Sequence, residues 1–134
     1  MPRPSLFTSA LLPALLAASA LAAPATPAKS GAYQTYTRAA FEAAKNRQRV
    51  LFFHATWCPN CKRADTEITR NLAGLPANVV VFKTDYDRES ALKRQYGITY
   101  QHTFVLVDAR GQALRKWSGG GLREIVKATR SARP

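Results

Sequence analysis

Two cysteines separated by two residues are the chemically distinctive feature of this sequence. Cys58 and Cys61 are the only cysteines among the 134 residues, and Pro59 and Asn60 lie between them. A disulfide between them would close a very small loop, which restricts the unfolded chain little and so adds little stability. A domain held together by disulfides would carry several pairs at wider spacings. The pair therefore predicts reversible chemistry, namely exchange between a dithiol and a disulfide.

This chemistry needs a thiolate, because the thiolate is the attacking form of a cysteine. Residues 62–72 favour a helix, and Pro59 suits its first turn because proline has no N–H to leave unpaired. Cys58 would then lie beside free backbone N–H groups at the positive end of the helix dipole, and both favour its thiolate. Cys61, one turn further on, is close enough to attack Cys58 and release a bound product.

The segments around the pair indicate how it is positioned. Strands are predicted at two apolar runs and at both arms of a hairpin, in segments 50–53, 79–82, 103–107 and 113–117. Helices are predicted in segments 37–46, 62–72, 89–96 and 122–130. The apolar runs suit strands buried on both faces, and the helix between them makes this pair parallel. The order predicts an α/β fold with a mixed four-stranded sheet and helices on both faces.

The segment Phe53–Lys62, which reads FHATWCPNCK, resembles the active site of thioredoxins. The order of the predicted elements, from about residue 33 to residue 130, is also similar to the thioredoxin fold. The resemblance implies that Cys58 is the exposed attacking cysteine and that Cys61 is the buried resolving cysteine. It requires no organic cofactor.

The residues expected to form the shell of the pair are Trp57, Pro59, Asn60, His54, His102 and Thr103. Trp57 should cover the cysteines and offer partners an apolar contact, and Asn60 can hydrogen-bond locally. Pro59 and Asn60 stand where typical thioredoxins carry Gly and Pro. Because these two positions tune the balance between thiolate and disulfide, the reduction potential does not follow from the resemblance.

Phe52 is the first departure from the thioredoxin pattern. Thioredoxins usually carry a buried Asp at this place, which assists proton transfer at the resolving cysteine, and Phe cannot do this. Deprotonation of Cys61 then needs water or another group. His54, two residues further along the same strand, is one candidate for that group. The alternative is that His54 is a packed, hydrogen-bonded strand residue.

His102 is the second departure, because it precedes Thr103 where the family usually places a cis-proline. A cis bond before a non-proline residue costs about 2.5–4 kcal/mol, so we predict a trans Gln101–His102 bond. The resemblance implies that this loop docks extended substrates by backbone pairing. Three roles remain open for His102: filling space, acting on the cysteines as an acid or base, or binding a metal ion together with Cys58 and Cys61.

The N-terminus is typical of an exported protein. Arg3 is followed by an apolar stretch over residues 10–21 and by small residues that suit cleavage after Ala22. We therefore predict a signal peptide over residues 1–22, a flexible tether over 23–32 and a thioredoxin-like domain over 33–134. The stretch is too short to span a bilayer comfortably, so no stable membrane insertion is expected after cleavage; an uncleaved anchor is the alternative. The predicted location is periplasmic or secreted.

The chain is strongly basic, with 20 Lys and Arg against 8 Asp and Glu and a formal net charge of +12. It has no recognisable nucleic-acid module and no long basic run, so we interpret the charge as a solvated basic surface and expect no nucleic-acid partner.

Together these features predict a monomeric thiol–disulfide oxidoreductase that acts on thiols and disulfides of exported proteins. An external redox partner, which the sequence does not identify, must reset the pair. We favour a reductase because the short chain has no inserted domain for large unfolded substrates. The alternative is a metal-binding or metal-delivery protein that uses Cys58, Cys61 and His102.

Overall fold

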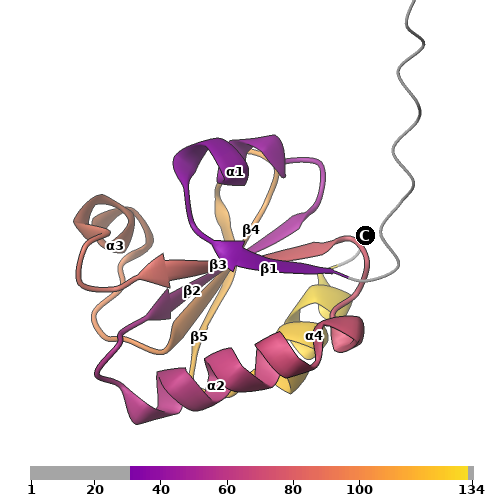
Figure 1. Ribbon diagram of the computed structural model, residues 1–134. Helices are drawn as coiled ribbons and strands as arrows, with labels where there is room; N and C mark the ends of the chain where they lie inside the picture. Colours follow the sequence, from indigo (N-terminus) through magenta and orange to yellow (C-terminus); the bar gives the residue numbers. More distant parts are fainter. Residues whose placement is uncertain (1–30, 133–134) are drawn as a thin grey trace, which may run out of the picture.

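A single mixed sheet forms the centre of the computed structural model, which describes residues 31–132 (Figure 1). Its strands are β1 (Ala32–Thr35), β2 (Gln48–His54), β3 (Val79–Asp85), β4 (Thr103–Val107) and β5 (Ala113–Ser118), in the spatial order β1-β3-β2-β4-β5. Strands β1, β3 and β2 are parallel, whereas β4 is antiparallel to both β2 and β5. The predicted signal peptide and most of the predicted tether lie outside the described residues.

The sheet has one strand more than the four that the sequence predicts. Strand β1 is short and lies at the edge of the sheet, where Ala32 pairs with Val80 and Thr35 pairs with Lys83. Its sequence, AYQT, contains no apolar run, and the tether was expected to extend to residue 32. The strand forms because its backbone pairs with the open edge of β3, which local patterning does not reveal.

Four α-helices cover the two faces of the sheet. They are α1 (Arg38–Ala43), α2 (Pro59–Arg70), α3 (Ser90–Tyr96) and α4 (Leu122–Ser131), and a short 3₁₀ helix, η1 (Leu72–Gly74), follows α2. Helices α1 and α3 lie on one face, and α2 and α4 lie on the other (Figure 1). The predicted helices on both faces are therefore confirmed, although α2 begins three residues earlier than the apolar pattern indicated. No helix within residues 31–132 has the length and apolar character needed to cross a membrane.

Strand β2 connects the two halves of the core because its side chains alternate between them. Val50 and Phe52 pack with α2 and α4, whereas Leu51 and Phe53 pack with α1 and α3. All four side chains are fully buried, as expected for a central strand covered on both faces. The cysteine motif, which starts four residues after His54, therefore directly follows a strand that is held in place on both faces.

Candidate functional site

Cys58 caps the N-terminus of α2. Its sulfur accepts a hydrogen bond from the backbone N–H of Cys61 at 3.2 Å, and Pro59 occupies the first turn as expected. Both cysteines are free thiols. Cys58, which was expected to be exposed, is only 4% exposed, and Cys61 is fully buried. Of the two cysteines, only Cys58 therefore has any exposed surface, and it lies at the end of the helix.

The environment of the two sulfurs separates their roles. The hydrogen bond from Cys61 and the positive end of α2 stabilise negative charge on the sulfur of Cys58. Burial raises the pKa of Cys61 to about 11, and the neighbouring Cys58 adds to the rise, whereas the peptide groups of Ala55 and His102 oppose it. Cys61 is therefore protonated at neutral pH and needs a base before it can attack.

An aromatic stack occupies the place of the acid that thioredoxins usually carry. Phe52 is fully buried, and its ring stacks on that of Phe104 at a centroid distance of 4.4 Å. Phe104 in turn stacks on Trp117 at 5.3 Å. Position 52 therefore provides packing and no proton acceptor.

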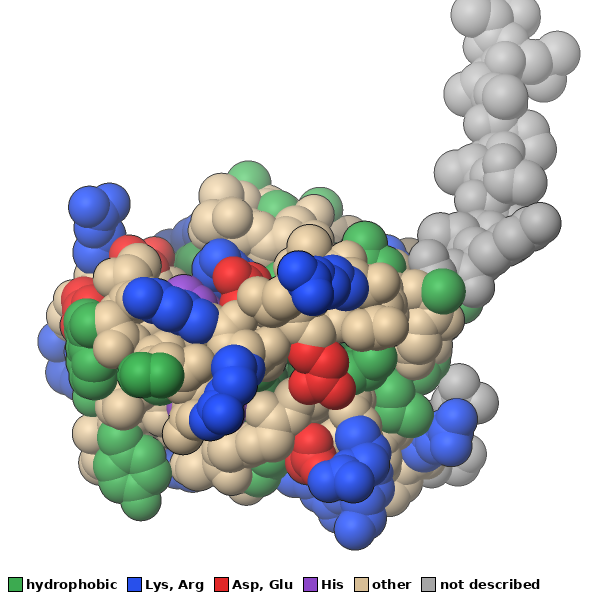
Figure 2. Space-filling view, turned by 60° about the horizontal axis from the view of Figure 1, so that its bottom comes forward, with side chains coloured by type: hydrophobic (Ala, Val, Ile, Leu, Met, Phe, Trp, Pro, Cys, Tyr) green, Lys and Arg blue, Asp and Glu red, His purple; other side chains and the backbone are tan. Residues whose placement is uncertain are grey.

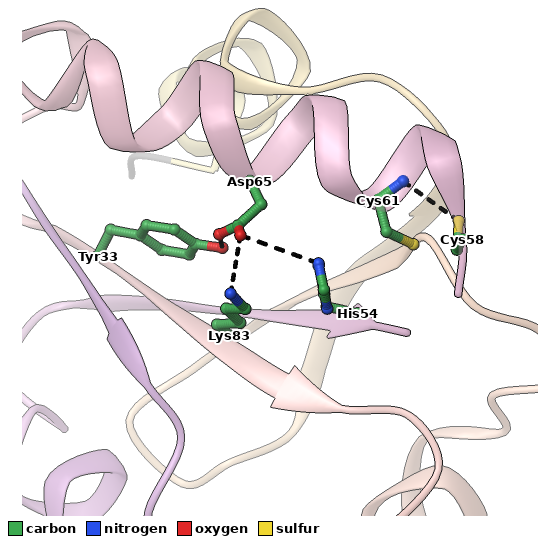
Figure 3. Close-up of polar contacts among 6 residues, drawn as sticks. All are labelled: Tyr33, His54, Cys58, Cys61, Asp65 and Lys83. Carbon is green, nitrogen blue, oxygen red and sulfur yellow. Dashed lines mark hydrogen bonds and ion pairs between the residues drawn. The ribbon is translucent and has the colours of Figure 1, made fainter. Parts of the chain in front are cut away.

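An acidic residue that the sequence analysis did not single out lies on α2 instead. The Asp65 carboxylate accepts a hydrogen bond from the Tyr33 hydroxyl at 2.6 Å and one from Lys83 Nζ at 2.8 Å. His54 Nε2 lies 4.0 Å from Asp65 Oδ2 (Figure 3). His54 is only 6% exposed, and within residues 31–132 its Nε2 has no hydrogen-bond partner. His54 is therefore packed, as the alternative interpretation expects, and its Nε2 is unpaired within these residues.

The charges in this cluster follow from burial and hydrogen bonding. Burial alone would raise the pKa of Asp65, but the hydrogen bonds from Lys83 and Tyr33 outweigh it and lower that pKa. Burial lowers the pKa of His54; the positive charge of Lys83 acts in the same direction, and Asp65 opposes it. Burial and the hydrogen bond to Asp65 raise the pKa of Tyr33. At neutral pH the cluster therefore contains an aspartate anion beside a neutral imidazole.

The sequence contained only part of the signal for this cluster. Asp65 follows Cys61 by four residues, a spacing that places both on one face of a helix. Lys83 and Tyr33 belong to strands that meet α2 only in the tertiary structure, and Tyr33 lies in the strand that was not predicted.

His102 has a backbone conformation that is uncommon for a residue other than glycine. Its φ is 55°, and no cis peptide bond occurs within residues 31–132, so the trans Gln101–His102 bond is confirmed. The backbone N–H of His102 donates to the Phe53 carbonyl at 2.8 Å, and its carbonyl accepts from the Gly119 N–H at 2.8 Å. Ring atom Nε2 donates to the Gly120 carbonyl at 2.8 Å.

These contacts bear on the three roles left open for His102. The bond to the Gly120 carbonyl occupies Nε2, so this nitrogen is not free for the cysteines. Within the described part of the chain, no three His, Cys, Asp or Glu side chains are close enough together to hold a metal ion. The structure therefore does not assemble Cys58, Cys61 and His102 as the ligand set of the metal-binding alternative.

The remaining predicted shell residues lie around the mouth of the site. Thr103 is buried and donates from its hydroxyl to the Tyr100 carbonyl at 2.9 Å. Trp57 is 57% exposed, and its indole N–H donates to Asp87 at 3.0 Å. The side-chain oxygen of Asn60 accepts a hydrogen bond from Arg63, one turn further along α2. Trp57 therefore presents an apolar surface beside Cys58 more than it covers the pair.

The basic side chains are dispersed around this site. Figure 2 shows the face that carries α2, where Lys and Arg side chains are spread across the surface with Asp and Glu side chains between them. This distribution fits the interpretation of the charge as a solvated surface.

Comparison with known proteins places the chain in a family. The thioredoxin family model matches residues 32–130. Thioredoxin H2-2 of Oryza sativa subsp. japonica is 37% identical over 62 residues, which cover 46% of this chain and 46% of that protein. Thioredoxin-1 of Drosophila yakuba is 32% identical over 85 residues, which cover 63% of this chain and 78% of that protein. The chain thus spans less than half the length of the rice relative.

The structural comparison agrees with the sequence comparison. The crystal structure of Trxlp from Edwardsiella tarda is 27% identical, covers 72% of this chain and 96% of that chain, and superposes with a TM-score of 0.60. The family model covers most of the chain, including both cysteines. This chain therefore belongs to the thioredoxin family.

Proposed function

We propose that this protein is a thiol–disulfide oxidoreductase that reduces disulfides of exported proteins through Cys58 and Cys61. One observation carries the proposal: Cys58, which is slightly exposed, caps α2, and its sulfur accepts a hydrogen bond from the backbone N–H of the fully buried Cys61. That arrangement provides an attacking thiolate and a protected partner for the second step.

The reaction proceeds in two exchanges. The Cys58 thiolate attacks one sulfur of the substrate disulfide, a Cys58–substrate bond forms, and the other substrate sulfur leaves and takes a proton. Cys61 then loses its proton and attacks Cys58, so that the Cys58–Cys61 disulfide forms and the second substrate thiol leaves. The dithiol supplies two electrons and two protons, and one substrate disulfide becomes two thiols. An external dithiol reductant then returns the pair to its reduced form.

The site and the domain support the direction of electron flow that we propose. Residues 31–132 form the sheet and its four helices without an inserted domain, so the surface around Cys58 suits local disulfides rather than large unfolded chains. Trp57 and Tyr100, which are 57% and 59% exposed, provide apolar contact area for a docked segment. The domain acts as a monomer.

The reduction potential of the Cys58–Cys61 couple tests the proposal most directly. We would equilibrate the protein with glutathione buffers of defined ratio and quantify both thiols. A potential of about −270 mV, as in thioredoxin, is expected for a reductant, whereas a value of about −120 mV would indicate an oxidant. Failure to form the disulfide reversibly would exclude exchange chemistry. The Cys58→Ser and Cys61→Ser variants, which cannot form the disulfide, are the matched controls.

Export rests on the N-terminal segment and needs its own test. Expression with the native N-terminus should yield periplasmic or secreted protein that begins at Ala23, as determined by intact mass. A chain that retains residues 1–22 in the membrane fraction would instead support the uncleaved anchor.

A further inference from the structure

We propose that His54 is the general base that removes the proton from Cys61 and that Asp65, held by Tyr33 and Lys83, is its positioning residue. This inference rests on the proposed function, because it concerns the second exchange of that reaction. Phe52 cannot accept the proton of Cys61, and the inference assigns that step to a histidine of β2 and an aspartate of α2.

The need for a base follows from the burial of Cys61. The sulfur is fully buried, so it cannot pass its proton readily to bulk water. Phe52 and Phe104, which pack in the same core cluster as Cys61, have no titratable group. The acceptor must therefore come from another side chain on the α2 face of the sheet.

The position of His54 meets this need. Figure 3 shows its imidazole on the side of the sheet that faces α2, between the carboxylate of Asp65 and the side chain of Cys61. Cys61 and Asp65 are four residues apart on α2, so they lie one above the other on the same face of the helix. The Nε2 atom of His54 is buried and has no hydrogen-bond partner within residues 31–132. An unpaired buried nitrogen lowers the stability of the fold, and a role in proton transfer explains why one is present here.

The charged groups that act on His54 come from two elements: Asp65 of α2, and Lys83 and Asp85 of β3. Tyr33 of β1 joins this cluster through its hydrogen bond to Asp65. Burial and Lys83 lower the pKa of His54, which keeps the imidazole neutral and able to accept a proton at neutral pH. Asp65 and Asp85 act in the opposite direction and stabilise the imidazolium once it forms.

Asp65 is held in place for this role by two hydrogen bonds. Tyr33 donates to Oδ1 at 2.6 Å, and Lys83 donates to Oδ2 at 2.8 Å. The 4.0 Å between His54 Nε2 and Asp65 Oδ2 is longer than a hydrogen bond, as expected when an unprotonated nitrogen faces a carboxylate. Protonation converts Nε2 into a donor that points at Asp65, so the charge is compensated where it appears.

The proposed step balances within the second exchange. In the mixed disulfide, the proton of Cys61 moves to His54 Nε2, directly or through one water. The resulting thiolate attacks the sulfur of Cys58, and the bond between Cys58 and the substrate breaks. The substrate sulfur leaves with the electron pair, and the imidazolium returns its proton to that thiolate through solvent. Loss of the Cys58 negative charge in the mixed disulfide also removes one of the effects that raise the pKa of Cys61.

Stopped-flow reaction of the reduced protein with excess 5,5′-dithiobis(2-nitrobenzoate) separates the two exchanges. The attack by Cys58 releases one coloured thiolate, and the attack by Cys61 releases a second, so the absorbance rises in two phases. Cys61→Ser should give only the first phase. In His54→Gln, we expect an unchanged first phase and a second phase that is about 100-fold slower at pH 7, within the range of general base catalysis.

The pH profile distinguishes a base from a structural residue. The second phase of the wild type should level off above the pKa of His54, which lies below its usual value. In His54→Gln, the rate should keep rising with pH because hydroxide replaces the base, and the defect should shrink toward the pKa of Cys61. Asp65→Asn should slow the second phase about tenfold and move the plateau to lower pH. Glu67→Gln, which removes an exposed carboxylate from the same helix, is the control and should match the wild type.

The outcomes separate this inference from the proposed function. If the wild type shows two phases, and the second phase keeps its rate and pH profile in both His54→Gln and Asp65→Asn, then His54 is not the base, but the proposed oxidoreductase function stands. If the wild type releases no coloured thiolate, or only one, both the proposed function and the role of His54 are wrong. A first phase that matches the wild type shows that a variant has folded with its N-cap intact.

Discussion

Asp65 shows how a single side chain changes the chemistry that surrounds a cysteine pair. Its carboxylate is half-buried and accepts hydrogen bonds from Tyr33 and Lys83, which come from the two strands opposite α2. These contacts keep the carboxylate ionised, and its Oδ2 lies 4.0 Å from Nε2 of His54. Phe52 occupies the position that carries the acid in most thioredoxins, and the acidic side chain of this cluster comes from α2 instead.

The ionisation of Asp65 predicts a pH-dependent contribution to stability. Its pKa is lower in the folded than in the unfolded protein, so the contribution is present above the unfolded pKa and is lost as the pH falls through the folded pKa. Asp65→Asn should lower the free energy of unfolding by about 1.5–3 kcal/mol at pH 7, the range for hydrogen bonds to charged groups. Urea unfolding should show this difference narrowing below about pH 4. An equal loss at pH 7 and pH 3 would contradict the argument.

At the scale of elements, the loop before β4 departs from the thioredoxin pattern at His102. A trans bond and a φ of 55° at His102 replace the usual proline geometry. Three hydrogen bonds hold this conformation: His102 N–H to Phe53, Gly119 N–H to the His102 carbonyl, and the ring to Gly120. Because the first of them joins the loop to β2 just before the cysteine motif, the loop and the motif are positioned together.

This geometry predicts that the family's own residue is unfavourable here. In His102→Pro, the proline ring fixes φ near −65°, far from 55°, and it removes the N–H that donates to Phe53. We expect a loss of about 2–3 kcal/mol in the free energy of unfolding. His102→Asn is the matched control, because asparagine tolerates a positive φ and should cost less. Chemical denaturation of both variants measures the difference, and a proline variant as stable as the wild type would show that the loop rearranges freely.

Over the whole molecule, the excess of positive charge is the property that acts on a partner at the longest range. The chain carries a net charge of +12, and Figure 2 shows basic side chains spread over the face that includes α2. A positive potential raises the rate of encounter with negatively charged partners. Salt screens this potential, so the increase in rate becomes smaller as the salt concentration rises. Recognition by charge would therefore add to the apolar contact that exposed Trp57 offers beside Cys58.

The charge predicts a salt-dependent preference among substrates. The reduction of an acidic disulfide peptide should be faster than that of a neutral peptide at low ionic strength, by about tenfold or more, and the difference should shrink as salt rises. A basic peptide of equal length should show the opposite dependence on salt. Values of kcat/KM across a sodium chloride series would measure this effect. The same salt dependence for all three peptides would show that the basic surface plays no part in encounter.

Local patterns determined most of the fold in advance. The apolar runs of β2 and β3 and the helix between them predict a parallel pair, and Pro59 and the cysteine spacing place Cys58 near the start of that helix. Each of these features lies within a few consecutive residues, so a short segment of sequence is enough to recognise it. The departures at positions 52 and 102 were visible for the same reason, because each falls at a fixed distance from a recognisable motif.

Only the tertiary structure decided what compensates for those departures. Tyr33 is 32 residues before Asp65, and Lys83 is 18 residues after it, so no local pattern links them. They meet because β1 pairs with β3 and because α2 packs across the face to which both side chains point. The positive φ of His102 likewise depends on bonds to β2 and to the glycines after β5. The sequence by itself determined which cysteines react; tertiary packing decided which side chains surround them, because the energy of a buried polar group depends on its neighbours in space.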